Sequence, residues 1–219
     1  IESWEDNLPK TIKLAYLPSA GIVKLRMSSL NTDGNAATVM EEESKKLHEI
    51  IGNDIFGYEE QTLEEIIKEL LLSRNQTLCT AESCTGGYLA HKITSVPGVS
   101  RVFPGSFVTY DYWVKTDILG VKKETLQKFG AVSEEVVIEM ARAAKEKLKT
   151  DYAIALSGIA GPDGGMPDKP VGTVWIAWAT PKGIIAKRFA FPGDRVGNIH
   201  LSYQKALNIL RSSKVKPAG

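Results

Sequence analysis

The chain reads Thr80-Ala81-Glu82-Ser83-Cys84-Thr85-Gly86-Gly87 directly after the apolar pair Leu78-Cys79. This pattern predicts a strand that ends in a turn crowded with hydroxyl and thiol side chains, with paired glycines opening the next helix. Backbone N–H groups at the start of a helix are unpaired and carry partial positive charge. Because a side chain placed there can attack a substrate while the N–H groups hold an anion, Ser83 is our first candidate for a nucleophile.

Strand and helix patterns alternate on both sides of this turn. Thr62 and Glu65 fit a capping box at the start of an amphipathic helix. Strands are expected over residues 77–81, 106–110 and 152–156, a late hairpin over 171–179 and 184–191, and helices over 85–95, 123–129, 133–149 and 195–210, with a short helix around Lys115. This alternation predicts an α/β fold in which a mixed sheet is covered by helices on both faces.

The chain divides into two predicted domains. Residues 1–59 are expected to form a small α+β module, residues 60–213 hold the alternating pattern, and residues 214–219 form a loose tail. The elements expected in the first module are strands over 11–17 and 21–26, a helix over 36–51 and a third strand around 54–58. Nothing in this first module is obviously catalytic.

Composition excludes several classes of function. A net charge of +1 over 219 residues provides no basic field for nucleic acid. The sequence has no apolar run long enough for a membrane span and no signal peptide. The two cysteines, Cys79 and Cys84, form no disulfide framework, and the three histidines share no ligand spacing. We therefore expect a cytoplasmic protein without a zinc site.

Two further turns follow predicted strand ends. One runs from Tyr110 to Lys115, and the other spans the glycine-rich residues 157–165. Ligands of open α/β sheets bind beyond the carboxyl ends of the strands, so we expect the three turns to form one polar pocket. Neither the Ser83 turn nor residues 157–165 has the Walker or the G-x-G-x-x-G spacing. The sequence therefore predicts neither of these two kinds of nucleotide-phosphate loop.

Each candidate residue also has a purely structural interpretation when taken alone. The structural alternatives are a helix cap for Ser83 and Thr85, a small buried residue for Cys84, a solvated lysine for Lys115, half-buried packing for Tyr110, a helix cap or ion-pair partner for Glu82, and a flexible loop for the glycines. The catalytic hypothesis gains force only if these residues meet in space.

Five motifs follow one another along the chain: the Ser83 turn, Tyr110 with Lys115, Ser157-Gly158-Ile159-Ala160-Gly161-Pro162, Lys169-Pro170-Val171-Gly172-Thr173-Val174 and Phe191-Pro192-Gly193-Asp194-Arg195. In this order they resemble the C-terminal domain of the CinA (competence-damage-inducible protein) family. Together the motifs cover nearly all of residues 62–210. A domain of this kind also occurs alone as bacterial nicotinamide mononucleotide deamidase.

The resemblance implies hydrolysis of the carboxamide of nicotinamide mononucleotide, with no metal or organic cofactor. No histidine lies near the motifs, so a serine–lysine arrangement remains among the known variants of the serine triad. The implied catalytic residues are Ser83 as nucleophile, Lys115 as base and Tyr110 as proton relay or orienting group. The implied oxyanion and substrate-binding residues are Glu82, Cys84, Thr85, Gly86, Ser157, Gly158, Gly161, Gly164 and Gly165, and Arg195 is the implied phosphate ligand.

The first module contains Trp4-Glu5-Asp6-Asn7-Leu8-Pro9, Leu14-Ala15-Tyr16-Leu17-Pro18 and Gly21-Ile22-Val23-Lys24-Leu25-Arg26. With these segments residues 1–59 resemble the KH-like middle domain of full-length CinA proteins. Those proteins carry a further N-terminal domain that is similar to molybdopterin-binding folds and associated with ADP-ribose pyrophosphatase activity. The chain opens on Ile1 without an initiator Met, so we expect a truncated form that lacks this domain and this activity. Residues 1–58 contain no Gly-x-x-Gly loop, which argues against nucleic-acid binding.

The expected partners are a small pyridine nucleotide and further copies of the chain. The alternative function is a catalytically silent nucleotide-binding module linked to competence or DNA damage, which would keep the pocket and lose the reaction.

Overall fold

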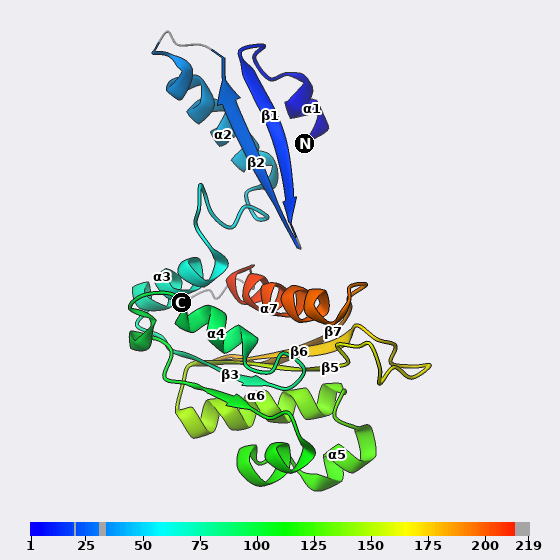
Figure 1. Ribbon diagram of the computed structural model, residues 1–219. Helices are drawn as coiled ribbons and strands as arrows, with labels where there is room; N and C mark the ends of the chain where they lie inside the picture. The colour runs from blue at the N-terminus through cyan, green and yellow to red at the C-terminus, as the bar shows by residue number, and fades with distance from the viewer. Residues whose placement is uncertain (20, 31–33, 213–219) are drawn as a thin grey trace. The chain divides into compact units, whose positions relative to one another are not determined.

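The structure is a computed structural model that describes residues 1–19, 21–30 and 34–212, so the predicted tail over 214–219 lies outside the described residues. It separates into two compact units, Ile1–Glu60 and Gln61–Gly219 (Figure 1). Among the described helices, none combines the length and the apolar character that crossing a bilayer requires.

The first unit is an antiparallel hairpin accompanied by two helices. Its elements are α1 (Glu2–Asp6), β1 (Ile12–Ser19), β2 (Ile22–Ser29) and α2 (Ala36–Ile51). Trp4 is buried, and its indole N–H donates to the buried carboxylate of Glu43 on α2 at 3.0 Å. This bond joins α1 to α2, and α2 in turn packs against β2, which supports a hairpin that would be marginal alone.

The predicted third strand around residues 54–58 is wrong, because these residues are turn and coil. Gly57 interrupts their short apolar run, and the hydroxyl of Tyr58 is hydrogen-bonded to His48 Nδ1 at 3.0 Å. A run this short has no period by which a strand can be distinguished from a packed loop. The KH-like character of this unit stays a prediction.

The second unit is built on one mixed sheet. Its elements are α3 (Leu63–Ser73), β3 (Leu78–Glu82), α4 (Tyr88–Thr94), the short 3₁₀ helix η1 (Val99–Arg101), β4 (Ser106–Val108), the π-helix η2 (Val114–Leu119), α5 (Lys123–Phe129), α6 (Glu134–Leu148), β5 (Tyr152–Gly158), β6 (Thr173–Thr180), β7 (Gly183–Ala190) and α7 (Arg195–Ser212). The sheet order is β4-β3-β5-β6-β7. The pairs β3–β4 and β3–β5 are parallel, whereas β5–β6 and β6–β7 are antiparallel.

Helices cover both faces of this sheet, as the sequence predicted. Figure 1 shows α3, α4 and α7 on one face and α5 with α6 on the other. Every residue of β3 is buried, which fits a strand covered on both sides. Small side chains such as Ala153, Ala155 and Ala177 belong to the core cluster that includes α6. Because β3 is parallel to both β4 and β5, the carboxyl ends of these three strands lie at the same edge of the sheet.

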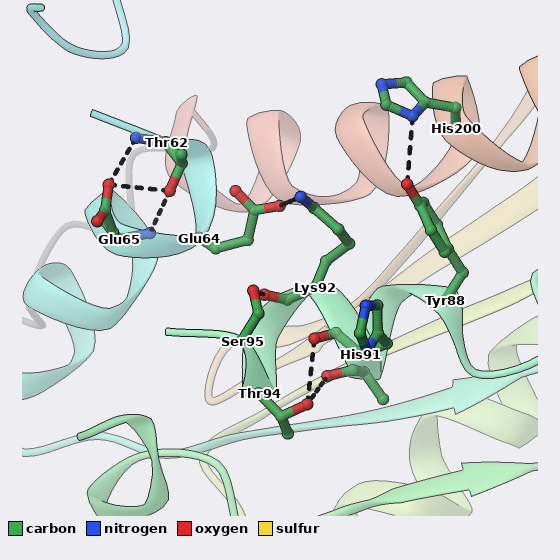
Figure 2. Close-up of polar contacts among 10 residues, drawn as sticks. Thr62, Glu64, Glu65, Tyr88, His91, Lys92, Thr94, Ser95 and His200 are labelled. Carbon is green, nitrogen blue, oxygen red and sulfur yellow. Dashed lines mark hydrogen bonds and ion pairs between the residues drawn. The ribbon is translucent and has the colours of Figure 1, made fainter. Parts of the chain in front are cut away.

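Helix α4, which follows the Ser83 turn, is fixed to its two neighbouring helices (Figure 2). Lys92 on α4 lies 3.5 Å from the buried carboxylate of Glu64 on α3. Tyr88 at the start of α4 is hydrogen-bonded to His200 Nδ1 on α7 at 3.4 Å. Side-chain contacts thus join helix α4 to both α3 and α7.

Candidate active site

The structure brings Ser83 and Lys115 together. Ser83 is the first residue after β3, and its N–H donates to the carbonyl of Leu156 on β5 at 3.0 Å. Lys115 lies on η2, and its Nζ is 3.0 Å from Ser83 Oγ. A hydroxyl and an amine at this distance can exchange a proton, which is the geometry that a nucleophile and its base require.

Lys115 is buried without an acidic partner. Only 1% of its surface is exposed, and in the described part of the chain it forms no ion pair. Its Nζ donates to the backbone carbonyls of Thr109 at 2.6 Å and Tyr110 at 3.1 Å. Burial lowers the pKa of Lys115 to about 8, against weaker opposing effects of Cys84 and Asp111. An appreciable fraction of this amine is therefore neutral near pH 7 and able to accept a proton.

Tyr110 reaches Lys115 through its backbone, not through its phenol. The side chain is 57% exposed, and its hydroxyl accepts a hydrogen bond from Arg195 Nη2 at 2.9 Å. Only its carbonyl contacts the amine. In this structure Tyr110 therefore orients the lysine, and the phenolic relay predicted from the sequence has no contact that would support it.

The remainder of the Ser83 turn is largely buried. Burial raises the pKa of the Cys84 thiol to about 12, and the negative charge of Glu82 adds to this increase. Thr85 is buried, and its hydroxyl finds no hydrogen-bond partner among the described residues. The N–H groups of Thr85 and Gly87 likewise donate to no described acceptor. No atom lies within 4 Å of where a side chain of Gly86 would begin, so the turn is open there.

Glu82 points into helix α4. None of its surface is exposed, and its carboxylate accepts the N–H groups of Leu89 at 3.0 Å and Ala90 at 2.8 Å. These bonds make it a helix cap, which was the structural alternative weighed from the sequence. Its carboxylate is therefore not directed at a substrate, although the sequence placed it among the binding residues.

Ser157 lies at the end of β5 with its hydroxyl already engaged. The hydroxyl donates to the carbonyl of Ala131 at 2.7 Å. A serine has one hydroxyl proton, so this contact leaves none for an oxyanion. The oxyanion donors that remain are the backbone N–H groups of the Ser83 turn.

The glycine-rich loop after β5 packs closely on the start of β6. A side chain at Gly158 would collide with Thr173 and Val174, and one at Gly161 with Val171. Gly165 also lies against Val171, whereas Gly164 has ordinary space beside Ile159. Contacts within the protein thus account for glycine at Gly158, Gly161 and Gly165.

Arg195 connects two of the three turns. Its Nη1 donates to the carbonyl of Gly161 at 2.7 Å while its Nη2 donates to Tyr110. Both acceptors are neutral, and the side chain forms no ion pair with any described carboxylate. The positive charge of this guanidinium is therefore uncompensated beside the loop.

Two residues to which the sequence analysis gave no role of their own hold this region together. Asn198 on α7 is buried and donates to the carbonyls of Ala160 at 3.0 Å and Gly193 at 2.9 Å. Gly172 donates to the carbonyl of Ile159 at 2.7 Å, and its own carbonyl accepts from Phe191 at 2.9 Å. A polar residue on the buried side of a predicted helix was the available signal for Asn198.

A hollow of about 290 Å³ lies between η2 and α5. Its walls include Tyr112, Trp113 and Leu126 but none of the predicted site residues. Tyr112 also places its ring centroid 5.9 Å from Lys115 Nζ. Within the described ranges, no cluster of three or more acidic, histidine or cysteine side chains could hold a metal ion.

Comparisons with known proteins identify relatives of this chain. The family model of the CinA C-terminal domain matches residues 60–214. A CinA-like protein of Flavobacterium psychrophilum is 45% identical over 218 residues, which cover 99% of this chain and 52% of that protein. A CinA-like protein of Cytophaga hutchinsonii is 44% identical over 96% of this chain and 51% of its own length. The chain thus spans about half the length of these relatives.

Solved structures show the same architecture. The competence damage-inducible protein A of Klebsiella pneumoniae has a TM-score of 0.67 and 37% identity over 70% of this chain and 94% of that one. The competence-damaged protein (CinA) superfamily protein of Escherichia coli has a TM-score of 0.67 and 33% identity over 74% of this chain and 98% of that one. A family match over most of the sequence, joined to this shared fold, shows that the chain belongs to the CinA family through its C-terminal domain.

Proposed function

We propose that the second unit hydrolyses the carboxamide of nicotinamide mononucleotide to nicotinate mononucleotide and ammonia. The observation that carries this proposal is the 3.0 Å approach of Ser83 Oγ to a buried lysine whose pKa is lowered to about 8. An amide is unreactive, so its hydrolysis needs an activated nucleophile, donors for an oxyanion and a proton for the leaving amine. The Ser83 turn and Lys115 supply all three.

The reaction follows from these groups in two halves. Ser83 Oγ attacks the carboxamide carbon while neutral Lys115 takes the hydroxyl proton, and the N–H groups of Thr85 and Gly87 stabilise the oxyanion. The C–N bond then breaks as Lys115 returns the proton to the leaving nitrogen, which departs as ammonia. Water, deprotonated by Lys115, next attacks the acyl-serine ester. The ester C–O bond then breaks as Lys115 returns the proton to Ser83 Oγ, which releases nicotinate mononucleotide and restores both residues.

Serine is the better nucleophile of the two neighbours in this turn. Lys115 Nζ contacts Ser83, whereas the thiol of Cys84 has its pKa raised to about 12. A thiol with so high a pKa is almost wholly protonated at neutral pH, and the thiolate is the reactive form. Cys84 is therefore a packing residue in this proposal.

Arg195 is the proposed ligand of the substrate phosphate. Its guanidinium is held in place by two neutral acceptors, Gly161 and Tyr110, and its charge is not neutralised by a described carboxylate. An incoming phosphate can replace the hydroxyl of Tyr110 and bind the fork in bidentate fashion. This contact would make the mononucleotide a better substrate than the riboside.

The direct test is ammonia release from nicotinamide mononucleotide, nicotinamide riboside and free nicotinamide. We expect turnover of the mononucleotide by the unchanged chain and none by Ser83→Ala. Binding of the mononucleotide without ammonia release would instead support a silent nucleotide-binding module, the second class of function considered from the sequence. Equal turnover of all three compounds would remove the phosphate role of Arg195.

A further inference from the structure

We infer that Glu82 is a positioning residue for the nucleophile: its buried carboxylate closes the loop from β3 to α4 and so holds Ser83 against Lys115. The inference rests on the proposed role of Ser83. It goes beyond that role because it assigns a task to a residue that does not touch the reacting atoms.

The contacts of Glu82 span the whole turn. The residue stands directly before Ser83, and its two carboxylate oxygens bind the N–H groups of Leu89 and Ala90, seven and eight positions further on. The hydroxyl of Thr80 lies 3.4 Å from the same carboxylate, on the strand side. The side chain of Glu82 thus connects the two ends of the five-residue turn between β3 and α4.

A buried carboxylate is a costly way to cap a helix. Glu82 has no exposed surface and, in the part of the chain that the structure describes, no cation pairs with it. Burying an unpaired charge is unfavourable unless hydrogen bonds compensate for it. A serine or aspartate at the N-cap position would satisfy the same N–H groups from the surface. The N-cap is instead Gly87 at φ +96°, a backbone conformation that a capping side chain rarely adopts.

The energetic cost of burying Glu82 is offset if catalysis requires the turn over residues 83–87 to keep one open conformation. A capping side chain at position 87 would bind only the N–H groups at the start of α4. Glu82 binds the same groups and, because it directly precedes Ser83, also links the start of α4 to the nucleophile. Helix α4 is itself joined to α3 through Lys92 and to α7 through Tyr88 (Figure 2). The position of Ser83 therefore depends on both the sheet, through its bond to Leu156, and helix α4, through Glu82. The negative charge of Glu82 also raises the pKa of Cys84, which favours serine as the nucleophile.

The chain offers a matched control at the start of α3. There the carboxylate of Glu65 accepts the N–H of Thr62 at 2.8 Å, and the hydroxyl of Thr62 accepts the N–H of Glu65 at 3.3 Å (Figure 2). This capping box holds a helix end that carries no candidate catalytic residue. Glu65→Gln removes a helix-capping carboxylate, as Glu82→Gln does, but one that binds within a single exposed turn.

The experiment compares Glu82→Gln with Glu65→Gln in the full chain. Labelling of Ser83 by a fluorophosphonate is timed by mass spectrometry; Oγ bonds to phosphorus, Lys115 takes the hydroxyl proton and fluoride leaves. The kcat and KM for ammonia release from nicotinamide mononucleotide and the Tm are measured in parallel. Both variants are expected to lose about 2–4 °C in Tm. Only Glu82→Gln is expected to slow labelling and kcat by about tenfold or more, with KM within about twofold.

The outcomes separate this inference from the proposed function. Labelling of Glu82→Gln at the unchanged rate, or of Glu65→Gln as slowly, would overturn the positioning role, and so would a failure of the unchanged chain to react. Labelling of the unchanged chain without ammonia release would refute the substrate alone, and Glu82 would still be judged from labelling. If Glu82→Gln is unfolded by circular dichroism, Glu82→Asp takes its place. A folded Glu82→Asp with slowed labelling supports the role, and either normal labelling or unfolding contradicts it.

Discussion

Helices α3 and α4 begin in opposite ways. Helix α3 is capped by its own sequence, because Thr62 and Glu65 bind each other's backbone within a single turn. Helix α4 starts from Gly87, which has no side chain, and takes its cap from Glu82 on the preceding strand. In this chain the helix start without a candidate nucleophile is thus capped locally, whereas the start that follows Ser83 is capped by a side chain from the preceding strand.

The largest expected effect on activity comes from removing the hydroxyl of Ser83, the candidate nucleophile before α4. Ser83→Ala is expected to lower kcat by on the order of a thousandfold or more, because the attacking atom is gone. Thr62→Ala removes a hydroxyl from the other start. It is expected to leave kcat unchanged and to cost about 1 kcal/mol of unfolding free energy, or about 2–4 °C in Tm. Steady-state ammonia release and thermal unfolding of both variants check this, and full activity of Ser83→Ala would refute the serine mechanism.

The two starts are also expected to respond at opposite ends of the pH range. Because the base is neutral Lys115, whose pKa burial lowers to about 8, kcat/KM should rise as pH increases through about 8. Hydrogen bonds from Thr62 lower the pKa of Glu65 below its ordinary value of 4.5. A lowered carboxylate pKa contributes stability above the unfolded value, and this stability is lost as pH falls through the folded value. The cap of α3 should therefore weaken only in acid.

Rate profiles and unfolding curves across pH measure both responses. Lys115→Met is expected to lower kcat/KM by about 10²–10⁴-fold and to abolish the limb near pH 8. A profile of Lys115→Met that keeps this limb would assign the base to another group. Glu65→Gln should leave the activity profile unchanged and lose only the acid dependence of the α3 cap.

A smaller effect is expected at Arg195, the first residue of α7. Arg195→Ala should raise KM for the mononucleotide by about 10–100-fold and change the riboside little, because only the mononucleotide has a phosphate. Arg188 on β7 provides the matched control, since it donates to the carbonyl of Asp168 in the same loop at 2.5 Å. Arg188→Ala should affect both substrates alike. Equal losses for the two substrates in Arg195→Ala would show that it only supports the loop.

The smallest effect is expected one residue from the nucleophile. Cys84→Ala should retain kcat within about threefold, because its protonated thiol takes no part in the chemistry. The same assay and the same mononucleotide serve for this measurement. A loss as large as that of Ser83→Ala would exchange the roles of the two neighbours.

Local patterns in the sequence were sufficient for much of the fold. The bounds of α2 and the capping box of α3 were predicted from residues a few positions apart, and the structure has both. The start of α4 was predicted near Thr85, but the helix begins at Tyr88. Its cap depends on a buried side chain from a strand, and no local signal describes such a contact. Boundaries set by tertiary contacts are therefore missed, whereas those set by neighbouring residues are found.

The candidate site was predictable to the same degree. The approach of Ser83 to Lys115 followed from turns at the ends of parallel strands, because topology brings those ends to one edge. The partners of individual polar atoms did not follow. The hydroxyl of Ser157 bonds to Ala131, and the phenol of Tyr110 bonds to Arg195. Such pairings depend on side-chain directions across loops, which spacing along the chain does not determine.

Gly172 sets a limit on how this domain can be remodelled. It bonds to Ile159 on one side and Phe191 on the other, and a methyl group added at its φ of +87° would collide with the carbonyl of Phe191. The backbone of Gly172 therefore lies between the glycine-rich loop and the segment that leads to Arg195, and it is hydrogen-bonded to both. A change on either side of Gly172 is therefore expected to shift both the loop and the segment that leads to Arg195. Insertions are better accommodated at the tip of the β6–β7 hairpin, where Gly183 has open space around it.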